Sequence, residues 1–188
     1  MSYVQNYFSG VKILIEQVSE EQVNRLADLL ETAWKEDKHV ILMGNGGSAG
    51  TASHIVNDIQ KCLQLECGKP IRAICLSDNT PLVLAWANDT EYANVYEPQI
   101  DCWAGKGDLV IAISGSGNSP NILRAAEAGK RKGAFVFGMA GYTGGKLIAA
   151  STECLVVATD NMQQIEDLHM MILHLAFSIV RDRNRTTN

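Results

Sequence analysis

The chain has 188 residues, of which 46% are hydrophobic and 20% are charged, and its formal net charge at pH 7 is −5. This length and balance predict one globular domain with a sizeable core. The acidic net charge argues against a nucleic-acid partner, and no apolar run approaches the length of a membrane span. A small-molecule function is therefore the expectation.

Two features of the sequence indicate a cytoplasmic protein. The opening stretch MSYVQNYFSG lacks the basic and then apolar layout of a signal peptide. The cysteines are odd in number and form no C-x-x-C pair, so reduced thiols are expected. They are Cys62, Cys67, Cys75, Cys102 and Cys154.

Helical patterns and short apolar strands alternate along the chain. The first clear helix follows Ser19, because Val23, Leu26, Leu30 and Trp34 then recur at helical spacing. The predicted strands are 39–43, 71–76, 108–114, 134–141 and 154–159. The predicted helices are 19–36, 48–65, one following Ser77, 119–133 and 161–182, and the polar tail RDRNRTTN is expected to fray.

This alternation, with strands that are continuous apolar runs, predicts a parallel sheet covered on both faces. We expect an α/β fold: a three-layer αβα sandwich with five parallel strands in a flavodoxin-like order and extra N-terminal helices. A single domain is expected over 1–188, with a helical segment 1–36, a sheet core 37–160 and a C-terminal helix 161–182. Ligands of such sheets bind beyond the carboxyl ends of the strands.

Two predicted strand–helix turns have similar sequences, GNGGS at 44–48 and SGSGNS at 114–119. Glycine permits close backbone approach to a ligand, and the start of a helix offers unpaired N–H groups to an anion. The chain has neither a phosphate loop of the G-x-x-x-x-G-K-[ST] type nor G-x-G-x-x-G, so no nucleotide cofactor is expected. The serine-rich turns suit a sugar phosphate. The alternative is that Ser48 and Ser119 only cap their helices.

VILMGNGGSAGTASH, IAISGSGNSPNILRAAEAGKRKG, GYTGGKL and QIEDLHMMILH together resemble the sugar isomerase (SIS) domain family, and within it the phosphoheptose isomerases, over roughly residues 20–180. The resemblance implies conversion of sedoheptulose 7-phosphate into D-glycero-D-manno-heptose 7-phosphate. It also implies a homotetramer with active sites between chains. Gly115 stands where the family usually has threonine. The substrate-binding residues implied are Asn45, Gly46, Gly47, Ser48, Asn88, Asp89, Ser114, Gly115, Ser116, Ser119 and Glu166.

His54 and Asp58 are four residues apart, on one face of the helix after the first turn. Aldose–ketose isomerisation needs a base and an acid, and a carboxylate and a histidine suit those roles. The resemblance implies catalytic roles for Asp58, Glu166 and His174. Asp58 replaces the family's Glu and Glu166 its Gln, so either carboxylate could take the proton. His169 lies off the His174 face and is expected to be structural.

The resemblance also implies a zinc site formed by His54, Asp58, Glu166 and His174, although proton transfer does not require a metal. Glu166 and His174 lie eight residues apart, about 12 Å along one helix. Either two chains share an ion, or only one of this pair binds it. Two other functions stay open: isomerisation of another sugar phosphate, and a non-catalytic sugar-phosphate-binding or regulatory role.

Overall fold

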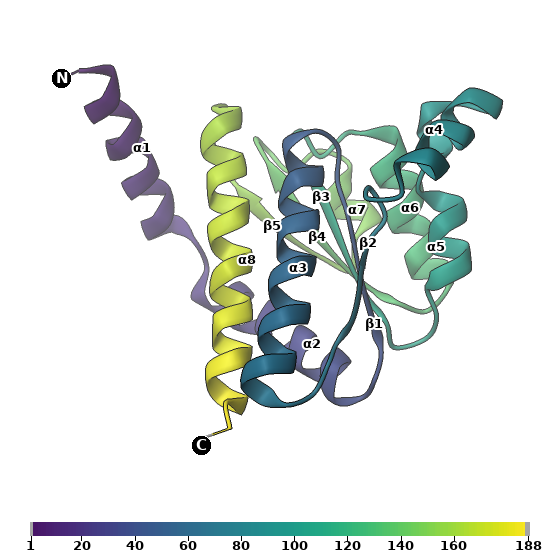
Figure 1. Cartoon of the computed structure of the whole chain (residues 1–188). Coiled ribbons are helices and arrows are strands. Elements are labelled where there is room, and N and C mark those ends of the chain that lie inside the picture. The colour runs from purple at the N-terminus through teal and green to yellow at the C-terminus, as the bar shows by residue number, and fades with distance from the viewer. Residues whose placement is uncertain (1, 187–188) are drawn as a thin grey trace.

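The computed structural model describes residues 2–186, in which a parallel sheet lies between two layers of helices (Figure 1). The strands pair in the order β2-β1-β3-β4-β5, and every neighbouring pair is parallel. This confirms the predicted sandwich, its five strands and its flavodoxin-like order. The strands are β1 (His39–Met43), β2 (Arg72–Cys75), β3 (Leu109–Ser114), β4 (Phe135–Gly141) and β5 (Glu153–Val157).

Each face of the sheet has its own hydrophobic core. The first core packs the sheet against α2 (Glu20–Lys35), α3 (Gly47–Cys67) and α8 (Met162–Asn184), with α1 (Tyr3–Gln17) outside them against α8 (Figure 1). The second core packs the other face, and alternate residues of one strand, such as Val110 and Ile111, enter opposite cores. Its helices are α4 (Thr80–Asp89), α5 (Glu97–Trp103), α6 (Pro120–Arg131) and α7 (Leu147–Ala150), with a 3₁₀ helix, η1, at Tyr92–Asn94.

Local signals in the sequence explain where the long helices begin and end. The Ser19 hydroxyl accepts a hydrogen bond from the backbone N–H of Gln22 at 3.2 Å, and Asn161 accepts one from Gln164 at 3.2 Å, so each caps its helix. Gly68 ends α3 in the left-handed conformation, with φ of 73°. Among the described residues, no helix combines the length and apolarity needed to span a membrane.

Three short elements were not predicted. The 3₁₀ helix η1 has three residues, α5 has seven and α7 has four, and such lengths are too short to show a helical repeat.

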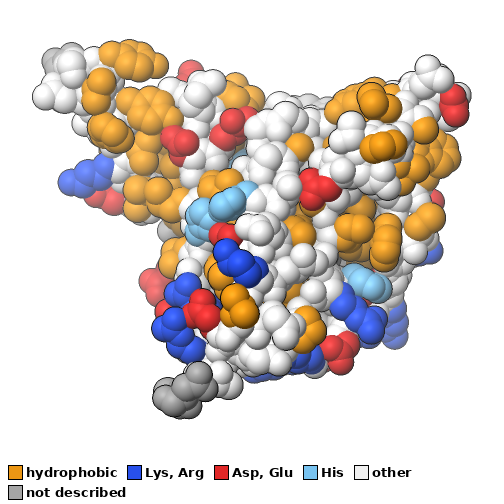
Figure 2. All heavy atoms as spheres, in the orientation of Figure 1, with side chains coloured by type: hydrophobic (Ala, Val, Ile, Leu, Met, Phe, Trp, Pro, Cys, Tyr) orange, Lys and Arg blue, Asp and Glu red, His pale blue; other side chains and the backbone are white. Residues whose placement is uncertain are grey.

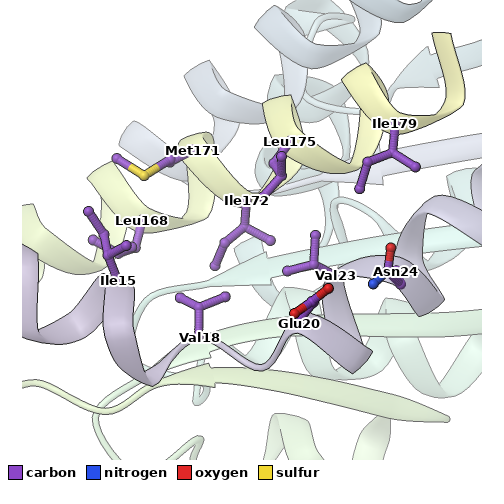
Figure 3. Close-up of a pocket in the computed structure, with 10 residues that line it drawn as sticks. All are labelled: Ile15, Val18, Glu20, Val23, Asn24, Leu168, Met171, Ile172, Leu175 and Ile179. Carbon is purple, nitrogen blue, oxygen red and sulfur yellow. The ribbon is translucent and has the colours of Figure 1, made fainter. Parts of the chain in front are cut away.

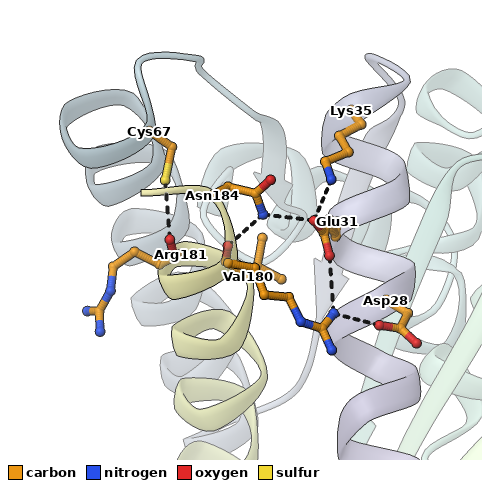
Figure 4. A network of polar contacts seen from close by, with 8 residues as sticks. Asp28, Glu31, Lys35, Cys67, Val180, Arg181 and Asn184 are labelled. Atoms are coloured by element: carbon orange, nitrogen blue, oxygen red, sulfur yellow. Dashed lines mark hydrogen bonds and ion pairs between the residues drawn. The ribbon is translucent and has the colours of Figure 1, made fainter. Parts of the chain in front are cut away.

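The prediction of a frayed tail was wrong. Helix α8 continues to Asn184, and Arg183 pairs with Asp28 at 2.7 Å and Glu31 at 3.1 Å on α2 (Figure 4). These ion pairs join segments that are far apart in the chain, so local composition gives no sign of them. Residues 187 and 188 of the tail lie outside the described range.

The strand order sets the position of a ligand site. From β1 the chain crosses to β2 on one side of the sheet, whereas β3 lies on the other side of β1. The turns after β1 and β3 therefore flank the point where the winding direction reverses, and both lie at the carboxyl edge of the sheet. In open α/β sheets this crevice is the usual ligand site. GNGGS and SGSGNS are the two sequences found there.

Candidate active site

Both glycine–serine turns open a helix whose first N–H groups have no side-chain cap. Helix α3 begins after Gly46, which has φ of 52° and no side chain to cap with, and α6 begins after Ser119. The Ser119 hydroxyl does not bond to its own helix, and instead lies 3.1 Å from the Ser114 hydroxyl. The alternative in which Ser48 and Ser119 only cap their helices therefore does not describe these turns. Two helix N-termini are left facing the crevice, an arrangement that favours an anion.

The serine side chains of the two turns differ in exposure. Ser48 and Ser114 are buried, with 6% and 4% of their surface exposed, whereas Ser116 and Ser119 are only partly buried. Ser116 accepts a hydrogen bond from the backbone N–H of Asn118 at 3.2 Å. The turns thus carry hydroxyls that are buried or partly buried, and such neutral donors can hold an anion without a lysine.

His54, Asp58 and His174 form a compact cluster between α3 and α8. Asp58 Oδ2 lies 3.3 Å from His54 Nε2 and 3.5 Å from His174 Nε2, and the two Nε2 atoms are 2.9 Å apart. One ligand atom from each residue lies within 4.8 Å of those of the other two, and His54 is exposed whereas Asp58 and His174 are partly buried. The helical spacing predicted that His54 and Asp58 share a face, and packing of α3 against α8 adds His174.

Glu166, the fourth residue of the expected metal set, is not part of this cluster. Its carboxylate lies against the first residue of α3, so that a methyl group at Gly47 would overlap both carboxylate oxygens. Glycine at 47 is therefore needed for this close approach. Glu166 and His174 belong to the same helix, and Glu166 is next to the glycine–serine turn whereas His174 is two turns further along α8.

The space beside Gly115 is occupied. A methyl group at Gly115 would overlap the thioether sulfur of Met162, the first residue of α8. The space beside the second turn is thus filled by an apolar side chain that comes from α8. Asn88 and Asp89, which were also expected to bind the substrate, are the last two residues of α4 and are exposed. The Asn88 amide donates to Asp89 at 2.9 Å.

His169 is a structural residue, as expected. It is 1% exposed, and its Nε2 lies 3.1 Å from the carbonyl oxygen of Ala140 at the end of β4. Because a carbonyl can only accept, Nε2 carries the proton. Burial lowers the pKa of His169 to about 4, so the ring is neutral near pH 7.

Sequence reasoning missed Asn121 and Tyr92, which contact the first turn. Asn121 bonds to Asn45 through both amide groups, and the Tyr92 hydroxyl donates to Asn45 Oδ1 at 3.0 Å. A signal for Asn121 was present, because it shares the buried face of α6 with Ile122, Ala125 and Ala126. A polar residue on an apolar helix face calls for a partner.

Comparison with known proteins identifies the family of the chain. The SIS domain family model matches residues 6–141. The chain is 33% identical over 163 residues to the probable phosphoheptose isomerase of Thermoplasma acidophilum, covering 87% of this chain and 89% of that protein. It is 34% identical over 161 residues to the phosphoheptose isomerase of Helicobacter pylori strain P12, covering 86% and 81%.

Among solved structures, the phosphoheptose isomerase of Neisseria gonorrhoeae shares the fold with a TM-score of 0.87 at 24% identity, covering 95% of this chain and 97% of that one. The family match and the two relatives confirm the resemblance that the glycine–serine turns and the C-terminal histidine motif indicated. The chain belongs to the SIS domain family.

Proposed function

We propose that this chain is an aldose–ketose isomerase that converts sedoheptulose 7-phosphate into D-glycero-D-manno-heptose 7-phosphate. The observation that carries the proposal is the cluster of His54, Asp58 and His174, which lies about two turns along α3 and α8 from the uncapped start of α3. Relatives that match over most of their length are named phosphoheptose isomerases. The reaction turns a ketose into an aldose, so a proton leaves C1 and another reaches C2 through an enediol.

The phosphate group is the part of the substrate that the two turns would bind. Its donors would be the hydroxyls of Ser48, Ser114, Ser116 and Ser119 and the first N–H groups of α3. At the start of α6 only the N–H of Asn121 would add to them, because Pro120 has no N–H and the N–H of Ile122 donates to Asn121 Oδ1. The hydroxyls of Ser114 and Ser119 lie 3.1 Å apart, close enough for both to donate to one phosphate oxygen. Asn88 and Asp89 would line the sugar.

Proton transfer is assigned to the carboxylates and His174. Asp58 Oδ2 lies within 3.5 Å of both imidazoles, so it orients them. Glu166 lies outside that cluster and beside the turn, where its carboxylate is free to act on the sugar. Glu166 therefore shares the role of base with Asp58, and His174 delivers a proton to a sugar oxygen.

Zn²⁺ fits the chemistry of the cluster, since two imidazole nitrogens and a carboxylate oxygen are donors that this ion prefers. With zinc bound, His54, Asp58 and His174 would hold the ion, and Glu166, outside its coordination shell, would be the carboxylate left to move the proton. A zinc ion there would supply Lewis-acid polarisation of the substrate carbonyl. The chain itself brings three metal-ligand atoms together from the two packed helices α3 and α8.

A homotetramer with active sites between chains is the proposed assembly. Exposed apolar side chains gather over α1, including Tyr3, Val4 and Phe8, and over α4, including Leu84 (Figure 2). A mostly aliphatic pocket also opens between the α1–α2 corner and α8, and no candidate site residue lines it (Figure 3). Apolar patches of this kind favour association with another chain.

The domain and compartment complete the proposal. One SIS domain spans 1–188, with the helical segment 1–36, sheet core 37–160 and C-terminal helix 161–182. The relatives align over more than four-fifths of this chain, with coverage of 87% and 86%, which supports a single unit. All five cysteines are free thiols, which supports a reducing compartment such as the cytoplasm.

Proton NMR of sedoheptulose 7-phosphate with the purified protein in D₂O, with and without zinc, tests the function. An aldose product with deuterium at C2 is expected. His174→Ala should remove turnover, whereas Gln64→Ala, an exposed change on α3, should not. Phosphate binding without turnover on any aldose or ketose phosphate would overturn the enzyme assignment and favour a sugar-phosphate-binding regulator. Turnover of a different sugar phosphate would overturn only the heptose assignment.

A further inference from the structure

A reciprocal pair of amides joins the two glycine–serine turns. Asn45 Nδ2 donates to Asn121 Oδ1 at 3.0 Å, and Asn121 Nδ2 donates to Asn45 Oδ1 at 2.9 Å. Asn45 belongs to the turn after β1, and Asn121 lies at the start of α6, immediately after the turn that follows β3. This pair is a direct side-chain bridge across the point where the sheet reverses its winding.

The orientation of both amides is fixed by further partners. Asn121 Oδ1 also accepts from the backbone N–H of Ile122 at 3.0 Å, and Asn45 Oδ1 also accepts from the Tyr92 hydroxyl at 3.0 Å. Rotating either amide group by about 180° would place its N–H donors against the N–H donors of the other residue. Each oxygen thus accepts two hydrogen bonds, and neither side chain can rotate without losing them.

Burial makes the bridge costly to break. Asn121 is 1% exposed and sits among the apolar residues of α6, where an unpaired amide is unfavourable. Asn45 supplies two of its three hydrogen bonds, counting the bond from Ile122. Asn121 is therefore neither the N-cap of α6 nor a surface residue. Its side chain is explained by its two hydrogen bonds to Asn45.

The neighbouring segment reinforces the first turn from the same side. The Tyr96 hydroxyl donates to the carbonyl of Gly44 at 2.6 Å. Arg124 of α6 bonds to Glu91 at 2.6 Å and to Asn94 at 2.5 Å, which ties η1 and its flanks to α6. The bridge thus lies at the centre of contacts that connect both turns and the segment that follows Asn88 and Asp89.

We infer that Asn121 is a positioning residue for the sugar-phosphate site, which keeps the two turns at a fixed separation through Asn45. The effect of this positioning on kinetics rests on the proposed function, in which both turns bind one phosphate group of the substrate. A phosphate held between donors on two elements gains most when the donors are already in place. Without the bridge the turns can move apart, and substrate binding has to restore their separation.

The test replaces Asn121 by Leu, which keeps the volume and removes the amide. KM for the sugar phosphate should rise about tenfold, because the partly buried amide of Asn45 loses both of its bonds to Asn121, while kcat changes much less. Hydrogen–deuterium exchange should accelerate in segment 44–48 as well as in 114–119. Asn45→Ala should give a similar rise in KM, and the double variant Asn45→Ala/Asn121→Leu should add little to it.

Gln99→Ala is the matched control. Gln99 is also a buried amide, 4% exposed, but it donates to the carbonyl of Val95 within its own helical region, away from both turns. Its loss should lower stability and leave KM and exchange at 44–48 unchanged. If Asn121→Leu leaves exchange at 44–48 at the native rate, the inference is overturned. That readout needs no turnover, so it separates this failure from failure of the proposed isomerase activity.

Discussion

The Nε2 atoms of His54 and His174 lie 2.9 Å apart, although 120 positions separate the residues in the chain, and their rings meet at 79°. Two imidazole nitrogens at this distance share one proton or direct both lone pairs at one cation, because two N–H groups would repel. Asp58 Oδ2, within 3.5 Å of both, adds negative charge to either arrangement.

Zinc binding is therefore predicted at one ion per chain. His54→Ala and His174→Ala each remove a donor and should weaken zinc binding by at least about a hundredfold, since even loss of an outer-shell partner costs about ten- to a hundredfold. Competition against a chromogenic chelator measures this, with Gln64→Ala as the exposed control on the same helix as His54. Native zinc affinity in His174→Ala would show that the cluster is not a metal site.

A carboxylate base should be able to act from position 58 of α3 or from position 166 of α8. Glu166→Gln should lower kcat by about a hundredfold or more, because a general base is removed. The double variant Asp58→Glu/Glu166→Gln, which restores the family's usual residues at both positions, should recover much of that loss. Steady-state kinetics on sedoheptulose 7-phosphate measures both effects. Full turnover in both Glu166→Gln and Asp58→Asn would exclude these carboxylates as the base.

The parallel sheet and the place of the two turns could be predicted from sequence because both depend on local signals. Alternating apolar runs and helical repeats specify a parallel sheet, and glycine–serine sequences after β1 and β3 mark its ligand edge. The spacing of His54 and Asp58 likewise needs no more than one helix. These features come from periodicity, which a single sequence displays.

Contacts between distant segments could not be predicted in the same way. The family resemblance, and not periodicity, implied that His174 joins His54, because that contact depends on how α8 packs against α3. That Glu166 lies at Gly47 depends on the absent side chain there. The bridge between Asn45 and Asn121 and the ion pairs of Arg183 with α2 also join residues more than seventy positions apart. Such pairings follow from tertiary packing, which local patterns do not encode.

Met162 should limit what residue 115 can be. Gly115→Thr would bring a hydroxyl to the second turn but would overlap the Met162 sulfur, so the flexible thioether must move and substrate affinity should gain little. The double variant Gly115→Thr/Met162→Ala makes room and should lower KM relative to Met162→Ala alone. Steady-state kinetics and phosphate binding by calorimetry measure the change. Equal KM in these two variants would show that a hydroxyl at 115 does not reach the substrate.

The ion-pair network around Glu31 should stabilise the C-terminal end of α8 (Figure 4). Lys35 donates to Glu31 at 2.5 Å, and Asn184 and Arg183 bond to the same carboxylate at 2.8 and 3.1 Å. These contacts, chiefly the hydrogen bond from Lys35, lower the pKa of Glu31 from 4.5 to about 2. Because the folded pKa is depressed, this stabilisation is present above pH 4.5 and is lost as the pH falls toward 2.

Glu31→Gln should consequently lower the free energy of unfolding at pH 7 by about 1 kcal/mol, a value reduced for solvent screening of the pair. Urea unfolding at pH 7 measures the loss. Glu36→Gln, at the exposed end of the same helix, is the control and should have no comparable effect. A variant as stable as the native chain would mean that α8 is held by its apolar face alone.

His169 should make the protein less stable in mild acid. Burial lowers its pKa from 6.5 to about 4 and leaves Nδ1 without a hydrogen-bond partner among the described residues. Between these two pH values the unfolded chain binds a proton that the folded chain does not, so stability falls as the pH drops from 6.5 toward 4 and is constant above 6.5. The full shift corresponds to about 3 kcal/mol.

His169→Gln keeps an amide that can donate to Ala140 and removes the titration. The free energy of unfolding, measured in urea at several pH values between about 4 and 7, should therefore fall more steeply with acid for the native chain than for the variant. Taking the difference between the two curves cancels other groups that titrate in this range, Glu31 included. Parallel curves would show that His169 takes up its proton while the protein stays folded. Its buried position on α8 against β4, at 1% exposure, makes that protonation unfavourable.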